Sequence, residues 1–182
     1  PVRIVLCDEV DRYPSSAGTE GDPVLLARRR SATFWDRKIV LTSTPTIAGA
    51  SRIESAFENT DKRKFLVPCP KCNHAQELKW SQIVWENKDA DTARYMCKKC
   101  DYKWTESERI KSISKGKWVA TSEGNGSNIG FHLSGLYSVW MTKFHRNDKD
   151  GANRPECNVY MYSNHNGNPA AANHFYSAHC EF

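Results

Sequence analysis

The chain has 182 residues, a formal net charge of +5 and 39% hydrophobic residues, which together predict one or two small domains with a modest core. Its mean hydropathy is −0.68, and no apolar run reaches the roughly 18 residues of a membrane-spanning helix, so we expect no membrane partner. The mildly basic charge permits a polyanionic partner without requiring one. The sequence opens on Pro1, with neither a starting Met nor a signal-peptide pattern, and is expected to be a fragment or a gene remnant.

A strand that ends in two acids is predicted first. Residues 2–7 form an apolar run bounded by charge, which is typical of a buried parallel strand, and Asp8 and Glu9 follow directly. Acids at the carboxyl end of such a strand lie where open α/β sheets bind ligands. In a nucleotide hydrolase the first acid would hold Mg²⁺ through its water shell, and the second would polarise the attacking water. A solvated acidic turn is the other interpretation.

A helix is predicted next, over residues 23–33. Asp22 and Pro23 are typical of an N-cap and a first helical position. Three arginines fall late in this helix, where they would complement its dipole as a solvated end or contact phosphate: Arg28, Arg29 and Arg30.

A second strand is expected over residues 38–42, which would complete a right-handed βαβ unit. The unit would place a hydroxyl cluster beside Asp8 and Glu9, at the same edge of the sheet. This cluster consists of Thr42, Ser43 and Thr44.

Four cysteines in two CxxC pairs are the most informative motif. A structural zinc ion needs four thiolates that converge in a tetrahedron, and two such pairs can supply them. The pairs are separated by residues 73–96. A redox CxxC would be single and would open a helix of a βαβ unit, so we favour zinc over redox chemistry or chance. The predicted ligands are Cys69, Cys72, Cys97 and Cys100.

The residues around these pairs have two interpretations each. A basic run precedes the first pair and is either a solvated approach or a DNA-backbone contact: Lys62, Arg63 and Lys64. Three aromatic residues flank the second pair, and we expect them to form a small core rather than to stack on bases: Tyr95, Tyr102 and Trp104.

The composition changes from Lys143 onward. Residues 143–182 have many Asn and His and little apolar periodicity, so we expect a disordered or out-of-frame tail. A second metal site is the less favoured interpretation of its His165, His174, His179, Cys157 and Cys180.

Five ordered blocks carry a resemblance to a known family. They are CDEVDRYP, EGDPVLLARRRSATF, KIVLTSTPT, SRIESAF, and FLVPCPKC with HAQELKW, followed by GKWVA and GFHLSGLYSVW. From about residue 3 to residue 142 the sequence resembles the large terminase subunit of lambda-type tailed phages, the GpA family. The resemblance implies that Asp8 and Glu9 are the Walker B magnesium-site acid and the catalytic carboxylate of an ASCE-type packaging ATPase. It also implies that the coupling motif, which links hydrolysis to DNA movement, consists of Thr42, Ser43 and Thr44.

The resemblance further implies cofactors and partners. These are ATP and Mg²⁺, double-stranded phage DNA, a small terminase subunit and the procapsid portal, in the cytoplasm of a bacterial host. The family also cuts unit-length genomes from a concatemer with a nuclease domain.

The expected fold class is α/β, a partial ASCE-type P-loop ATPase core with parallel strands and a crossover helix, followed by a small β-rich zinc ribbon. We expect the end of the ATPase domain over residues 1–60, the ribbon over 61–108, a linker towards a nuclease domain over 109–142, and the unmatched tail over 143–182.

Departures from the family pattern shape the expected activity. No GxxxxGK[ST] motif stands in the sequence, and Gly116-Lys117 is followed by Trp118, so no phosphate cradle is expected here. The family's nuclease domain would follow residue 142, and residues 143–182 show no match to it. We therefore expect the isolated chain to lack ATPase and nuclease activity. Two alternatives are a non-enzymatic zinc-ribbon module that binds nucleic acid or protein, and an inactive prophage remnant.

Overall fold

The computed structural model describes residues 1–47, 49–87, 89–139 and 158–165. The chain divides into two compact units. The first consists of Pro1–Arg63, Ala120–Leu133 and the segment that begins at Asn158, and the second consists of Lys64–Val119 and the segment that begins at Ser134.

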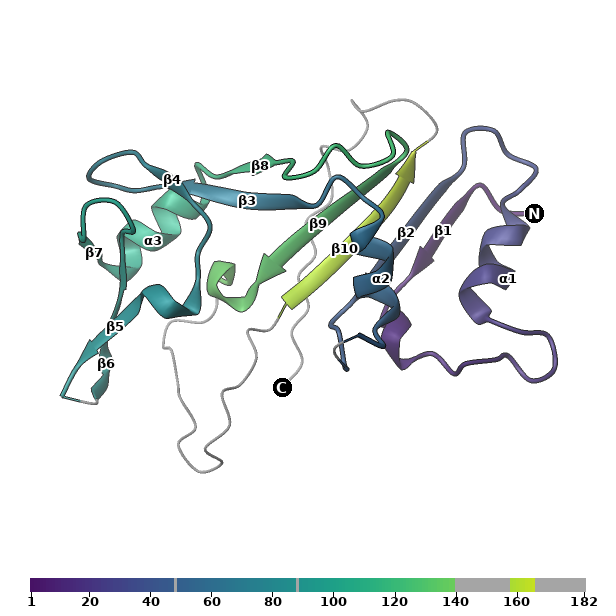
Figure 1. The fold of residues 1–182 in the computed structure, drawn as a ribbon, viewed down its shortest axis with the longest axis horizontal. Helices are drawn as coiled ribbons and strands as arrows, with labels where there is room; N and C mark the ends of the chain where they lie inside the picture. The colour runs from purple at the N-terminus through teal and green to yellow at the C-terminus, as the bar shows by residue number, and fades with distance from the viewer. Residues whose placement is uncertain (48, 88, 140–157, 166–182) are drawn as a thin grey trace. The chain divides into compact units, whose positions relative to one another are not determined.

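The first unit is built on a mixed sheet. Strand β1 (Ile4–Cys7) pairs in parallel with β2 (Lys38–Ser43), and helix α1 (Pro23–Arg30) lies between them in the chain. This arrangement confirms the predicted parallel strands with a connecting helix. The other edge of β2 pairs antiparallel with β10 (Asn158–His165), and β9 (Asn128–Ser134) follows β10 in the sheet (Figure 1).

Both helices of this unit begin at side-chain caps. The Asp22 carboxylate accepts hydrogen bonds from the backbone N–H groups of Val24 at 2.8 Å and Leu25 at 3.0 Å, as an N-cap residue does. Helix α2 (Arg52–Glu58) begins after Ser51, whose Oγ accepts from the N–H of Glu54 at 3.0 Å. Helix α1 ends at Arg30, three residues earlier than predicted, because the N–H groups of Ser31 and Ala32 turn back to the carbonyls of Arg28 and Arg29.

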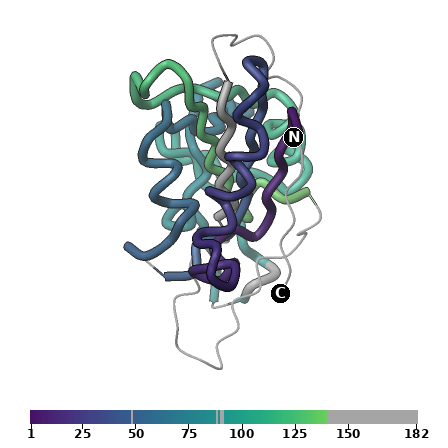
Figure 2. Tube along the Cα trace, turned by 90° about the vertical axis from the view of Figure 1, so that its right-hand side faces the viewer, coloured from purple at the N-terminus to yellow at the C-terminus, as the bar shows by residue number. Residues whose placement is uncertain are grey.

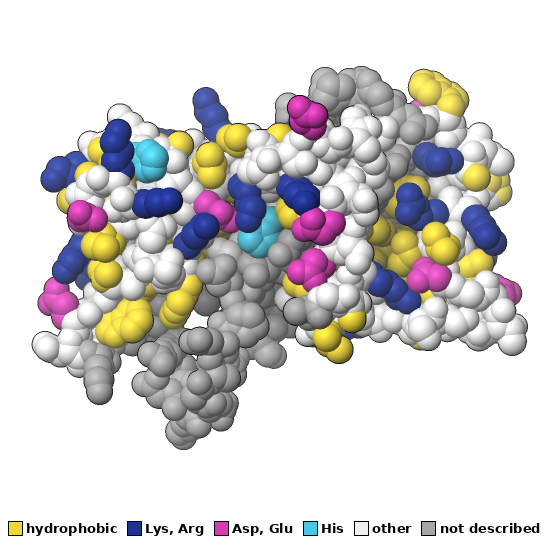
Figure 3. Space-filling model, in the orientation of Figure 1, with side chains coloured by type: hydrophobic (Ala, Val, Ile, Leu, Met, Phe, Trp, Pro, Cys, Tyr) yellow, Lys and Arg dark blue, Asp and Glu magenta, His cyan; other side chains and the backbone are white. Residues whose placement is uncertain are grey.

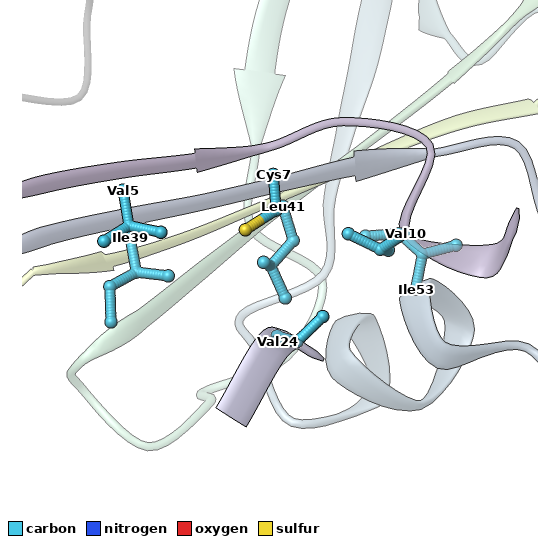
Figure 4. Close-up of a cluster of buried hydrophobic side chains, with 7 residues drawn as sticks. All are labelled: Val5, Cys7, Val10, Val24, Ile39, Leu41 and Ile53. Carbon is cyan, nitrogen blue, oxygen red and sulfur yellow. The ribbon is translucent and has the colours of Figure 1, made fainter. Parts of the chain in front are cut away.

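Both helices pack on one face of the parallel pair. Val5 is in register with Ile39 and Cys7 with Leu41, and alternation along each strand turns these four side chains to the same face. They form one buried cluster with residues of α1, α2 and the short 3₁₀ helix η1 (Val10–Arg12), as Figure 4 shows. The cluster consists of Val5, Cys7, Val10, Val24, Ile39, Leu41 and Ile53.

The opposite face of β1 is exposed. Ile4 is 51% and Leu6 is 67% exposed, and β1 is the terminal strand of the sheet among the described residues. The N-terminus before this strand faces the viewer in Figure 2.

The second unit contains the cysteine pairs and consists largely of short antiparallel strands. Strand β3 (Arg63–Pro68) pairs with β4 (Ala75–Gln76) and with β8 (Lys117–Val119). A three-stranded sheet contains β5 (Ile83–Glu86), β6 (Asp89–Met96) and β7 (Lys103–Trp104), and it precedes helix α3 (Glu106–Ile113). The 3₁₀ turns η2 (Trp80–Gln82) and η3 (Gly135–Tyr137) also belong to this unit.

Two of the three aromatic residues predicted to form a small core are buried in this unit, whereas Tyr102 is only half-buried and its hydroxyl bonds to Glu108. Tyr95 and Trp104 are buried, and their ring centroids lie 4.8 Å apart. The Tyr137 hydroxyl donates to the carbonyl of Phe65 at 2.6 Å and accepts from the N–H of Leu78 at 2.8 Å. The buried Tyr137 side chain therefore holds residues 134–139 against β3 and the segment that follows β4.

Two expectations about the later part of the chain differ from the structure. Residues 109–142, expected to be a linker, contain most of α3 together with β8, β9 and η3. The reason is that a capping box at Thr105 and Glu108 starts α3, and that buried residues alternate along β9.

Among the described residues, no helix is long and apolar enough to cross a membrane.

Residues 158–165, expected to belong to a disordered tail, form β10, in keeping with the strand-favouring Val and Tyr that they contain. The rest of the segment 143–182 lies outside the described residues. So do Cys157, His174, His179 and Cys180 of the less favoured second metal site, whereas His165 is the last residue of β10.

Candidate functional site

The carboxyl end of β1 brings an acid and a hydroxyl together. Asp8 is exposed directly after the strand, and its Oδ1 accepts hydrogen bonds from the N–H of Glu9 at 3.0 Å and from the Thr42 hydroxyl at the end of β2. Parallel pairing puts the two strand ends at one edge of the sheet. The predicted contact between the acidic turn and the hydroxyl cluster is therefore present.

Glu9 stands beside Asp8 in an unusual backbone conformation. Its φ is 55° and its ψ is 39°, in the left-handed region, and its carboxylate pairs with Arg12 at 2.9 Å. The sheet edge thus carries two neighbouring carboxylates, an exposed one on Asp8 and a half-exposed one on Glu9. Carboxylate and hydroxyl oxygens are the ligands that Mg²⁺ prefers, so the chemistry of this edge fits a magnesium nucleotide.

Two hydroxyls of the predicted coupling motif, those of Thr42 and Ser43, have different partners. Ser43 is buried, unlike Thr42, and its Oγ accepts from the N–H of Asp11 at 3.2 Å and donates to the carbonyl of Thr44 at 3.3 Å. Thr42 and Ser43 thus make two separate contacts with the turn that follows β1.

Two half-buried residues, Asp11 and Arg52, also hold this turn in place. Neither was predicted from the sequence. The Asp11 carboxylate accepts from the N–H of Ile53 at 2.9 Å and of Thr46 at 3.1 Å. Arg52 is the first residue of α2 and donates to three carbonyls of residues 10–14. Both residues are visible in the sequence, but nothing local indicates that Asp11 binds the start of α2 or that Arg52 binds the carbonyls of residues 10–14.

The four predicted cysteines converge to a metal-sized cluster. Their Sγ atoms all lie within 4.8 Å of one another, with 3.8 Å between Cys69 and Cys100 and 3.7 Å between Cys72 and Cys97. A regular tetrahedron with metal–sulfur bonds of about 2.3 Å has sulfur–sulfur edges of about 3.8 Å. The donor set and its spacing therefore fit one tetrahedral metal ion.

The two CxxC loops have the same backbone structure. The N–H of Cys69 donates to the carbonyl of His74 at 2.9 Å, and the N–H of Cys97 donates to that of Tyr102 at 3.0 Å. Asn73 and Asp101 occupy equivalent positions with φ of 56° and 55°. An Asn or Asp after each CxxC pair, residue types that tolerate the left-handed region, was the signal that could have predicted these turns.

Polar groups around Cys97 favour its thiolate, whereas burial raises the pKa of Cys69. Burial opposes ionisation of Cys97, but the backbone N–H groups of Lys99 and Cys100 and the neighbouring thiols outweigh it and lower its pKa to about 6. The Gln76 side chain lies 3.5 Å from the Cys97 sulfur through Nε2, and its Oε1 accepts from the N–H of Lys98 at 2.9 Å. Gln76 therefore orients both a ligand and its loop, as outer-shell groups of metal sites do.

The predicted phosphate contacts divide into two groups. Lys62 pairs with Glu58, Arg63 with Asp61 at 2.7 Å, and Lys64 with Glu77 at 2.9 Å. Among the described residues no acid pairs with the three arginines at the end of α1, which are Arg28, Arg29 and Arg30. On the face drawn in Figure 3, lysines and arginines alternate with acids rather than forming one basic field.

Comparison with known proteins decides the family. Residues 1–118 match the family model of the phage terminase large subunit gpA, ATPase domain. The chain belongs to this terminase family. It is 30% identical over 137 residues to the terminase large subunit of Enterobacteria phage P21, which covers 71% of this chain and 21% of that protein. It is also 30% identical over 98 residues to the terminase large subunit of Escherichia phage lambda, which covers 50% of this chain and 15% of that protein.

The chain thus spans 21% or less of the length of these terminase relatives. No solved structure matches it. Both the acidic turn at Asp8 and the four cysteines lie within the part that matches the terminase ATPase domain.

Proposed function

We propose that this chain is part of the motor that packages phage DNA, in which the terminase large subunit hydrolyses ATP to move DNA into a procapsid and cuts concatemeric DNA. The family match supports an ATPase domain. The single observation that carries the proposal is the contact between strand ends, where the Thr42 hydroxyl donates to Asp8 and Glu9 follows at once.

Each residue of this edge has a role in the proposal. Asp8 holds Mg²⁺ through its water shell, and Glu9 orients and polarises the attacking water as a general base. Thr42, with Ser43 and Thr44, senses the state of the nucleotide through its bond to Asp8. Bound Mg²⁺ supplies charge neutralisation at the phosphates.

The cysteine cluster has a structural role in the proposal. A tetrathiolate set favours zinc or iron–sulfur chemistry, and two CxxC loops in a small β-rich unit favour structural zinc. Zinc held by Cys69, Cys72, Cys97 and Cys100 fixes the ribbon to which residues 134–139 are fastened.

The wider assignment follows the family. It includes double-stranded phage DNA, the small terminase subunit and the procapsid portal as partners, in the host cytoplasm. Because no GxxxxGK[ST] motif stands in these 182 residues, hydrolysis requires a phosphate-binding loop from elsewhere in the subunit. The 182-residue chain by itself should hydrolyse neither ATP nor DNA.

The proposal is tested in the complete terminase subunit that carries this segment. Glu9→Gln should remove most ATP turnover while leaving ATP binding, because it deletes the water-polarising carboxylate and preserves shape. Asp8→Asn should instead weaken Mg²⁺-dependent ATP binding. Glu20→Gln, at an exposed acid, is the matched control and should change neither. Normal turnover by the Glu9→Gln subunit would refute the assignment.

A further inference from the structure

We infer that Asp11 is a positioning residue. It couples the turn at residues 8–12, which carries Asp8 and Glu9, to the loop after β2 and to helix α2. The inference rests on the proposed ATPase function and adds a residue and an output element to it. Three hydrogen bonds carry it, each joining segments more than 30 residues apart in the sequence.

The first link runs from the turn to the loop after β2. The backbone N–H of Asp11 donates to the buried Ser43 hydroxyl at 3.2 Å, and the Asp11 carboxylate accepts from the N–H of Thr46 at 3.1 Å. Residues 43–46 are therefore bound to Asp11 at both ends. The same loop begins one residue after Thr42, whose hydroxyl contacts Asp8.

The second link runs from the turn to α2. The other oxygen of Asp11 accepts from the N–H of Ile53 at 2.9 Å, and Ile53 is fully buried in the core beneath β1 and β2. Arg52 strengthens this contact by donating to the carbonyls of Val10, Tyr13 and Pro14. It also pairs with Asp22, the N-cap of α1, at 3.1 Å.

Because of these contacts, the turn after β1, the loop at residues 43–46 and the start of α2 are expected to move together. Each Asp11 oxygen accepts one backbone N–H, so the carboxylate cannot follow one partner without disturbing the other. A shift of the loop when Thr42 responds to nucleotide is therefore passed to the start of α2. Among the described residues, Asp11 makes no hydrogen bond with Asp8 or Glu9, so it acts on them through the backbone.

Asp11→Asn is the decisive substitution. Asn preserves the shape but replaces one of the two acceptor oxygens by an NH₂ group, which cannot accept from a backbone N–H. In the complete subunit we expect kcat for DNA-stimulated ATP hydrolysis to fall by about a hundredfold, the effect of a displacement of about 1 Å at a catalytic group. The KM for ATP should change less than about twofold, because uniform binding is retained.

Ser43→Ala provides a second test of the same link. It removes the acceptor of the Asp11 N–H, whereas Asp11→Asn alters the carboxylate that accepts from Thr46 and Ile53. Because both sets of hydrogen bonds hold the same turn to the same loop, the kcat losses in the double variant Asp11→Asn/Ser43→Ala should be less than multiplicative. Asp36→Asn is the matched control, because this half-buried acid pairs with Arg3 at 3.2 Å and has no hydrogen bond to the turn at Asp11 among the described residues. It should leave kcat unchanged.

The outcomes separate the inference from the proposed function. An Asp11→Asn subunit that is fully folded at the assay temperature, with normal kcat or with a raised KM alone, overturns the inference. Multiplicative losses in the double variant overturn it as well. Normal turnover by Glu9→Gln, measured in parallel, would instead overturn the ATPase assignment.

Discussion

Three residues other than glycine adopt left-handed backbone conformations at the two candidate sites. Glu9 follows the strand-end acid, and Asn73 and Asp101 close the two cysteine loops, with φ between 55° and 56°. Asn and Asp tolerate this region, whereas Glu is less suited to it. Strained residues of this kind persist where the surroundings hold them, and they concentrate at functional sites. Glu9 is held by its N–H bond to Asp8 and by Arg12.

The metal site gives a prediction at the scale of a single residue. We expect one zinc ion per 182-residue chain, and we expect Cys97→Ser to abolish stoichiometric zinc and to unfold the ribbon. The physical reason is that structural zinc supplies about 10–16 kcal/mol of folding free energy in zinc-finger peptides. Metal analysis of the purified chain, together with labelling of free thiols, measures both effects.

Cys7→Ala is the control for that experiment, since Cys7 lies in the core cluster of the first unit and not among the ligands. This variant should keep its zinc. Wild-type protein without zinc and with four reactive thiols would rule out the site.

Among the elements, those with local signals were predictable from the sequence. The apolar run of β1, the cap of α1 at Asp22 and the CxxC spacing each depend on neighbours within a few residues. The parallel β1–β2 pair followed from them. What the sequence could not show depends on distant contacts, such as the Asp11–Ile53 bond and the Lys64–Glu77 pair.

The sequence also did not indicate that the chain returns to the first unit after the segment with the cysteines. Residues 120–133 return to the first unit after the cysteine-bearing segment, where the Asp61 carboxylate accepts from the N–H of Gly130 at 3.1 Å. Such a return depends on tertiary pairing rather than on local propensity.

Helix α3 gives a prediction at the scale of an element. The Glu108 carboxylate accepts from the N–H of Thr105 at 2.8 Å and from the Tyr102 hydroxyl at 3.0 Å. The Thr105 N–H is the main cause of the lowered pKa of Glu108. Thr105→Ala should cost about 1 kcal/mol of unfolding free energy, since it removes the N-cap oxygen.

The same capping box has a defined pH dependence. A carboxyl whose folded pKa is depressed contributes stability above its unfolded pKa, and this stability is lost as the pH falls through the folded value. The thermal midpoint of the second unit should therefore fall less between about pH 7 and about pH 3 in Glu108→Gln than in the wild-type chain. Equal falls in both proteins would contradict this assignment.

On the scale of the whole molecule, the net charge is +5, but the basic side chains differ in how readily they could bind a polyanion. Lys62, Arg63 and Lys64 are already paired with acids, and contact with DNA phosphates would have to displace those acids. The arginines at the end of α1 have no such competitor among the described residues. They are the better candidates for phosphate contact.

Two triple variants with the same change in charge test this difference. Replacing Arg28, Arg29 and Arg30 by Gln should weaken DNA binding by the 182-residue chain and reduce its salt slope by about 2–3, because each phosphate contact contributes about 0.9. Replacing Lys62, Arg63 and Lys64 by Gln should change the slope little. Gel shifts at several salt concentrations measure both, and equal losses in the two variants would show that only total charge matters.

The exposed face of β1 has a consequence for handling the protein. Leu6 and Ile4 lie on a terminal strand whose outer backbone groups pair with no described segment. An unpaired apolar strand edge is a template for adding a further strand from another molecule, and this is how many proteins begin to aggregate. The 182-residue chain should therefore lose solubility with rising concentration, however stable its folded core, until some other polypeptide covers that edge.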